Sequence, residues 1–179
     1  MEEIKNLHDK IKQSPYWLGF DEDFVRELRR DYYKLTDLIS AKFEYHSINV
    51  YSDKYYALLQ PMHHDVRSYV GCLEYRKGQD GFGDVILYLQ QYLTLVHQMI
   101  DGWETPHICV KTKYWTQTMY SEQFDHPNYG KVWRNYVEIP KEQKQIVIDW
   151  WREHFGSKES IKKFIEEMEN DTCITYRFI

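Results

Sequence analysis

The side chains best suited to chemistry in this sequence are three neighbours, His63, His64 and Asp65. Neutral imidazole and carboxylate groups are ligands that divalent transition metals accept. A metal ion held by them would polarise a phosphoryl oxygen and activate a water molecule for hydrolysis. His97 and Asp101, four positions apart on an expected helix, would add ligands, although such a pair more often forms a local contact on the polar side of a helix.

The triplet resembles the histidine–aspartate dyad of the HD-type phosphohydrolases, which bind a metal ion on a helical bundle. The resemblance implies a metal-dependent phosphohydrolase whose dyad is completed by His46 upstream and by one downstream aspartate, at Asp101, Asp125 or Asp149. The alternative that we favour is the N-terminus of a surface helix directly after Pro61, where the helix dipole stabilises the charge of Asp65. On that alternative the chain holds no metal ion.

The other motifs match no known catalytic or cofactor-binding pattern. The glycine-rich segment 78–83 precedes an expected helix, but its spacing differs from the dinucleotide fingerprint and from the P-loop, and Asp80 and Asp84 would repel an anion. No serine or cysteine stands in a recognised nucleophile sequence. We therefore expect no cofactor and favour a role other than catalysis, with the metal-dependent hydrolase as the alternative.

Aromatic residues make up 17% of the sequence, and sixteen of them are tyrosines, which favours a protein that works through contact surfaces. The candidate contact residues combine cations with aromatic rings in one stretch of the chain and are Lys111, Lys113, Tyr114, Trp115, Tyr120, Trp133 and Arg134. Such a stretch can be a half-buried strand with solvated lysines, a surface for a protein partner, or a platform for single-stranded nucleic acid. Trp17, in an aromatic loop, either packs on the core or joins this surface.

The composition sets limits on partners and compartment. A net charge of −5 argues against phosphate contacts as the main role, and no apolar run is uninterrupted enough to span a membrane. Three separated cysteines without a CxxC pair favour a reducing, cytoplasmic compartment. Only two alanines occur, a usage typical of AT-rich genomes, which fits a phage or another mobile element of a low-GC host.

Hydrophobic spacing divides the chain into a helical part and a mixed part. Apolar residues at three- and four-residue steps predict helices over 2–13, 21–43, 52–73 and 84–103, with Pro61 ending or kinking the third. Residues 46–51 fit a short strand or a connection. Alternation predicts a strand over 107–119, a polar connection over 121–130, and a strand or helical turn over 132–139. Helices over 141–155 and 157–168 and a strand over 172–179 follow, and the last strand should pair with 108–118.

These elements predict an α+β fold in which a mostly helical bundle packs against a small antiparallel sheet formed by the C-terminal half. We expect one domain over residues 1–179, with a helical part (1–105) and a mixed part (106–179). The function we favour is that of an interaction or inhibitor protein with a protein partner. Nucleic-acid binding and a homodimer are the alternatives for the partner.

Overall fold

The structure is a computed structural model that describes residues 1–14, 22–43, 45–46, 50–71 and 82–179. In the N-terminal half, the described residues form the helices α1 (Glu2–Gln13), α2 (Glu22–Lys42), α3 (Lys54–Gly71) and α4 (Phe82–Asp101). The strands are β1 (Tyr45–His46), β2 (Val50–Tyr51), β3 (His107–Lys111), β4 (Thr116–His126), β5 (Gly130–Ile139) and β6 (Tyr176–Phe178). Between β5 and β6 lie the short helix η3 (Lys141–Gln143), α5 (Lys144–Phe155) and α6 (Glu159–Glu169).

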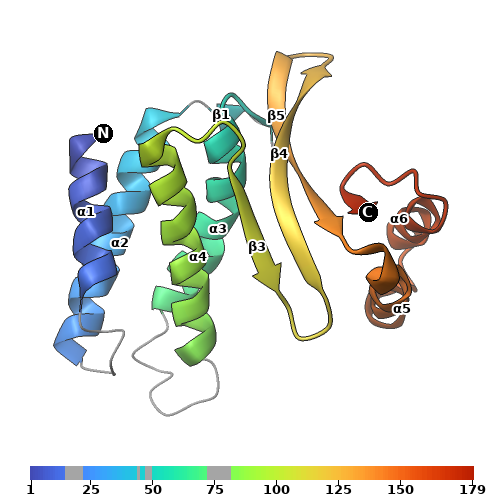
Figure 1. The fold of residues 1–179 in the computed structure, drawn as a ribbon, viewed down its shortest axis with the longest axis horizontal. Helices are drawn as coiled ribbons and strands as arrows, with labels where there is room; N and C mark the ends of the chain where they lie inside the picture. Colours follow the sequence, from blue (N-terminus) through green and yellow to red (C-terminus); the bar gives the residue numbers. More distant parts are fainter. Residues whose placement is uncertain (15–21, 44, 47–49, 72–81) are drawn as a thin grey trace.

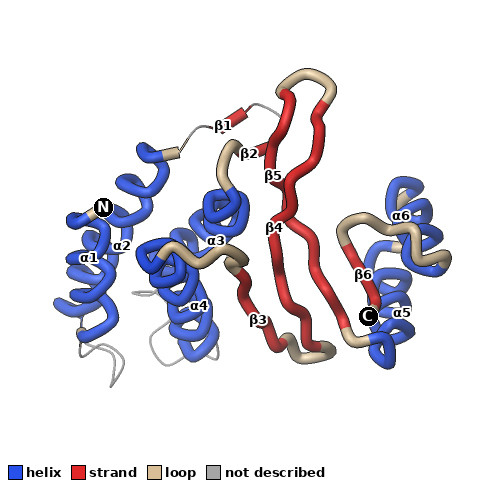
Figure 2. The backbone as a smooth tube through the Cα atoms, turned by 45° about the horizontal axis from the view of Figure 1, so that its top comes forward, coloured by secondary structure: helices blue, strands red, loops and turns tan. Residues whose placement is uncertain are grey.

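The strands form one sheet in the order β1-β2-β5-β4-β3, and β6 also pairs with β5. All pairs are antiparallel except β5 with β6. The long β4–β5 ribbon stands between two groups of helices, α1–α4 and α5–α6 (Figures 1 and 2). The α+β class predicted from the sequence is therefore confirmed.

Two hydrophobic cores hold the helices to the sheet. The first joins α1–α4 to β2 and β3, and at its centre the fully buried rings of Tyr32 and Tyr92 meet edge to face at 5.3 Å. The second joins the ends of β4–β6 to α5 and α6 and contains Ile139, Val147 and Met168. Met119 of β4 packs against both cores, so one side chain connects the two groups of helices.

The helix α3 runs through Pro61, so a helix end at Pro61 and the surface-helix N-terminus expected directly after it were both wrong. Its N-terminus begins as expected at Asp53, whose Oδ1 accepts hydrogen bonds from the backbone N–H groups of Tyr55 and Tyr56. Pro61 has no N–H to offer the carbonyl of Ala57 one turn earlier. The side-chain amide of Asn135 donates to that carbonyl instead, which offsets the lost helical hydrogen bond.

The sheet differs from the prediction in three places. The segment 107–119 is a hairpin, because Thr112 Oγ1 accepts hydrogen bonds from the N–H groups of Tyr114 and Trp115 and closes a turn. The segment 121–126, expected as a connection, continues β4 because each of its residues pairs with β5. The C-terminal strand pairs with β5 in parallel and not with 108–118, because Tyr176 and Phe178 pack against the second core beside Val137 and Ile139 of β5.

Candidate interaction surface

Alternation along β4 and β5 separates a covered face of the sheet from an open one. On the covered face, Ser121 Oγ donates to the carbonyl of Lys54 in α3, and Asn135 reaches α3 in the same way. Met119 and Val137, which pair across the two strands, enter the cores. The intervening residues point to the other face, and none of them belongs to either core, although Val132, which pairs with Phe124, is buried.

We call this other face the open face and define it by side chains from four strands, namely His107, Cys109, Lys111, Tyr120, Glu122, Phe124, Arg134, Tyr136, Glu138 and Arg177. Its centre is a pair of stacked rings, Tyr120 and Tyr136, whose centroids are 5.5 Å apart. The guanidinium of Arg177 lies 3.7 Å from the centroid of the Tyr136 ring, and that of Arg134 lies 4.5 Å from Phe124. Such cation–π contacts hold the planar groups flat on the sheet.

One carboxylate ties the two arginines together. Glu122 Oε1 accepts hydrogen bonds from Arg134 Nε at 2.9 Å and from Arg177 Nη2 at 2.6 Å. Partial burial raises the pKa of Glu122, but the hydrogen bonds from Arg177 and Arg134 outweigh it and hold the pKa below its usual value of 4.5. The open face therefore presents aromatic and guanidinium groups whose positions are fixed before any partner arrives.

The structure brings some of the predicted contact residues together on this surface. Tyr120 and Arg134 lie on the open face, and Lys111 lies at its β3 edge. Lys113 and Tyr114 extend from the turn beyond β3, where the Tyr114 side chain is 49% exposed. Trp17 lies outside the described residues.

The last two predicted contact residues, Trp115 and Trp133, face away from this surface. Trp115 is buried in the second core, where its Nε1–H donates to Gln117 Oε1 at 2.8 Å and its ring meets Trp150 edge to face. Trp133 pairs with Gln123 on the covered face and packs against the first core. Both rings therefore act in the structure as packing groups.

Sequence reasoning missed Glu122, Phe124, Glu138 and Arg177. The alternation Tyr120, Glu122, Phe124 would have indicated one strand face, had 121–130 not been interpreted as a connection. Arg177 carries no such signal, because its place depends on β6 pairing with β5, 39 positions apart at Glu138↔Arg177.

The proposed metal ligands do not assemble in the part of the chain that is described. His63 of α3 is buried against α2 and α4, and its Nε2 forms a hydrogen bond with the Tyr92 hydroxyl at 2.7 Å. Asp65 is exposed, and the side chain of His64 lies outside the described part. Among the described residues no group of three or more histidine, cysteine, aspartate or glutamate side chains could hold a metal ion.

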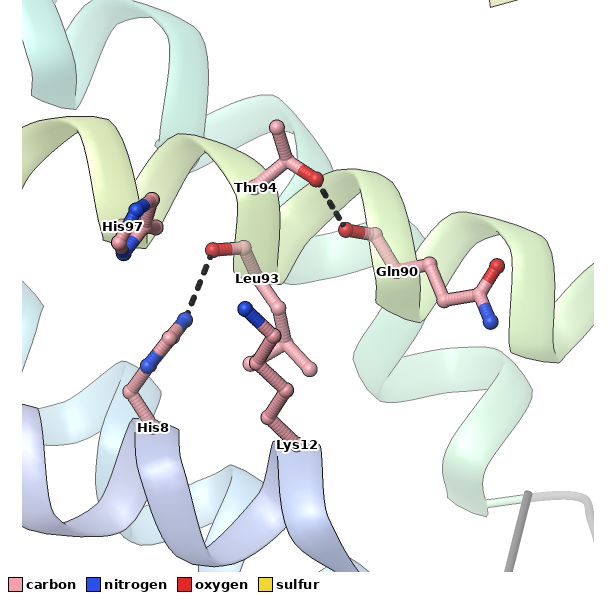
Figure 3. A pocket seen from close by; sticks show the side chains of 6 residues that line it. All are labelled: His8, Lys12, Gln90, Leu93, Thr94 and His97. Carbon is pink, nitrogen blue, oxygen red and sulfur yellow. Dashed lines mark hydrogen bonds between the residues drawn. The ribbon is translucent and has the colours of Figure 1, made fainter.

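His97 and Asp101 form the local pair expected of residues four apart, with 3.2 Å between Nε2 and Oδ2. His97 also stacks on His8 of α1, with 5.8 Å between ring centroids. The two histidines border a cavity of about 390 Å³ between α1 and α4 (Figure 3). There His8 Nε2 contacts the carbonyl oxygen of Leu93 at 3.1 Å, so His8 is engaged in joining the two helices.

Comparison with known protein families, curated proteins and solved structures yields no match for this chain. In the described segments, none of the helices combines the length and the apolar character that crossing a membrane requires. The geometry of the open face is therefore the basis for a functional conclusion.

Proposed function

We propose that this chain works by binding a partner protein through the open face of its sheet, as an interaction or inhibitor protein. The observation that carries the proposal is the array of Tyr120, Tyr136 and Arg177, stacked on one another and fixed by Glu122. Tyrosine and arginine are among the residue types that contribute most to binding energy at protein interfaces. Side chains held in place beforehand lose less entropy on binding, which favours affinity.

The charges on the open face favour a protein over a nucleic acid. Lys111 could contact a phosphate, but Glu122 and Glu138 lie in the same array as the stacked tyrosines. A phosphate backbone crossing those rings would approach both carboxylates, in a chain whose net charge is already −5. A protein partner can instead place polar groups opposite both signs of charge.

The test uses a photo-reactive phenylalanine analogue at position 136, in place of Tyr136, in the full chain expressed in its source cells. We expect ultraviolet light to cross-link one defined protein at this position. The same analogue in place of Tyr33, a half-buried tyrosine on α2, is the matched control and should not capture that protein.

The captured protein is then purified, and its affinity for the chain is measured by calorimetry. We expect Arg177→Ala to weaken binding at least tenfold, because the substitution removes a cation from Tyr136 and a hydrogen bond from Glu122. Arg26→Ala, an exposed arginine on α2, is the control and should leave the affinity unchanged. Equal affinities for the Arg177 variant and the unmodified chain would refute the proposal.

A further inference from the structure

The edge of β3 that faces away from β4 has no neighbouring strand among the described residues, but at one residue a side chain forms hydrogen bonds with its backbone. The N–H of His107 donates to Gln98 Oε1, and its carbonyl accepts from Gln98 Nε2, both at 2.9 Å. The amide of Gln98, on α4, thus pairs with His107 as the backbone of a neighbouring strand would. These two hydrogen bonds also show that the N–H and C=O groups of His107 point away from β4.

Two further residues of β3 present backbone groups along the same edge. In an antiparallel pair, residues alternate between pointing their N–H and C=O toward the partner strand and away from it. His107 points away, and Thr112 points inward, because its N–H donates to the carbonyl of Trp115 at 2.9 Å. Cys109 and Lys111 therefore point outward with His107, and the described residues include no hydrogen-bond partner for their backbone groups.

A groove of about 490 Å³ runs along this edge, with α4 as its opposite wall. Leu87, Gln91 and Thr94 line it from α4, and Ile108 and Cys109 line it from β3. Leu87, one of these lining residues, is 44% exposed. Figure 1 shows α4 running beside β3, so a segment in the groove would lie between a helix and a strand.

We propose that an extended segment of the partner protein adds to the sheet as a strand beside β3, continuing the pairing that Gln98 begins. Its backbone would bond to the N–H and C=O groups of Cys109 and Lys111. This inference rests on the proposed function and names the kind of segment that the partner contributes. A single strand fits better than the β3 edge of a second copy, because α4 closes the far side of the groove.

The side chains of the groove specify the chemistry of that segment. Alternate residues of an added strand would face α4, where Leu87 favours an apolar side chain. The residues between them would lie beside Cys109 and Lys111 on the open face. The ammonium group of Lys111 has no carboxylate within salt-bridge distance among the described residues, so an acidic residue opposite it completes a cross-strand pair.

The probe is a synthetic hexapeptide of alternating valine and glutamate, acetylated and amidated at its ends. Nuclear magnetic resonance of the full chain should show slower hydrogen exchange of the Cys109 and Lys111 amides when the peptide is added. Two further peptides carry N-methyl groups on all glutamates or on all valines. In an added strand, either the valine N–H groups or the glutamate N–H groups face β3, but not both. One methylated peptide should therefore lose binding, and the other should keep it.

Cys109→Pro is the matched variant of the protein. The proline removes the outward N–H while leaving the β3–β4 hydrogen bonds intact, as prolines do on edge strands. We expect peptide affinity to fall at least tenfold, whereas Arg26→Ala, at an exposed position on α2, should bind the peptide normally.

Three results would overturn the inference: unchanged exchange of the Cys109 and Lys111 amides, binding of both methylated peptides, or normal binding by a folded Cys109→Pro variant. None of them bears on cross-linking from position 136, so the proposed function can stand while this inference fails. Conversely, peptide addition at β3 with no partner captured from position 136 would refute the proposed function and leave strand binding at β3 in place.

Discussion

The side-chain amide of Asn135 on β5 donates a hydrogen bond to the backbone carbonyl of Ala57 in α3, 78 positions away in the chain. That carbonyl is the one that Pro61 leaves without its helical donor. The proline thereby supplies an acceptor on the side of α3 that faces the sheet. A residue that weakens the helix locally also provides the contact that docks it.

This relationship predicts coupling between Asn135 and Pro61. Asn135→Ala should lower the free energy of unfolding by about 1–2 kcal/mol, because the Ala57 carbonyl then loses its donor. In a Pro61→Ala background the same substitution should cost less, since the new N–H at position 61 can bond to Ala57. Urea denaturation of the four proteins gives the coupling energy, and additive effects would contradict the explanation.

Glu122 should stabilise the open face at neutral pH. Glu122→Gln keeps the shape of the side chain but weakens its bonds to Arg134 and Arg177, at a cost of about 1–2 kcal/mol in the free energy of unfolding. Because the pKa of Glu122 is lowered in the folded state, its contribution is present above the unfolded value of 4.5 and is lost as the pH falls through the folded pKa.

Denaturant titrations of both proteins between neutral pH and the acid limit measure this difference. The difference in the free energy of unfolding between wild type and Glu122→Gln should disappear in acid. A difference that stays constant with pH would show that the charge of Glu122 contributes nothing to stability, and that the substitution acts through packing.

His63 should make the helical core sensitive to mild acid. Burial, assisted by the positive charge of Arg67 and opposed by Asp37, lowers its pKa from 6.5 to about 4. Between these values the unfolded chain binds a proton that the folded chain does not, so stability should fall as the pH falls from 6.5 to about 4. The loss from this group is on the order of 3 kcal/mol.

The control is His63→Gln, whose side-chain amide can also form a hydrogen bond with the Tyr92 hydroxyl. The difference in stability between wild type and this variant should depend on pH only through that window. Parallel pH profiles for the two proteins would show that His63 is not the group responsible.

Substitution by alanine should lower the free energy of unfolding far more at Trp115 than at its neighbour Tyr114. Trp115→Ala removes a buried ring from the second core and should cost about 3–5 kcal/mol of unfolding free energy. Tyr114→Ala removes an exposed ring and should cost much less. Thermal denaturation of the two variants checks the assignment of Trp115 as a packing residue, and similar small losses for both would contradict it.

Local patterns in the sequence were sufficient to predict the helices. In α4, Val85, Leu89, Tyr92 and Val96 recur at helical spacing, and all four are fully buried. Likewise Asp53 and the residues after it carry the signal of a capped helix start, which α3 confirms. Such signals depend on neighbours within one or two turns, so they can be read without knowing the rest of the fold.

Local patterns were insufficient for the sheet and for the surface built on it. The polar run Ser121–His126 reads as a connection because one of its faces is open, and only pairing with β5 makes it a strand. The burial of Trp115 and Trp133 depends on which face of the sheet receives the helices. No sequence pattern indicates that choice, because an aromatic ring suits a core as well as an interface.

The sequence by itself determined the α+β class, the helices and their buried stripes, because hydrophobic spacing and capping are encoded within a few residues. The tertiary structure alone decided that Arg177 reaches Glu122, that Asn135 reaches Ala57 and that the outer edge of β3 faces a groove beside α4. Those contacts join residues far apart in the chain, and strand register and packing fix them together when the sheet closes on its two cores.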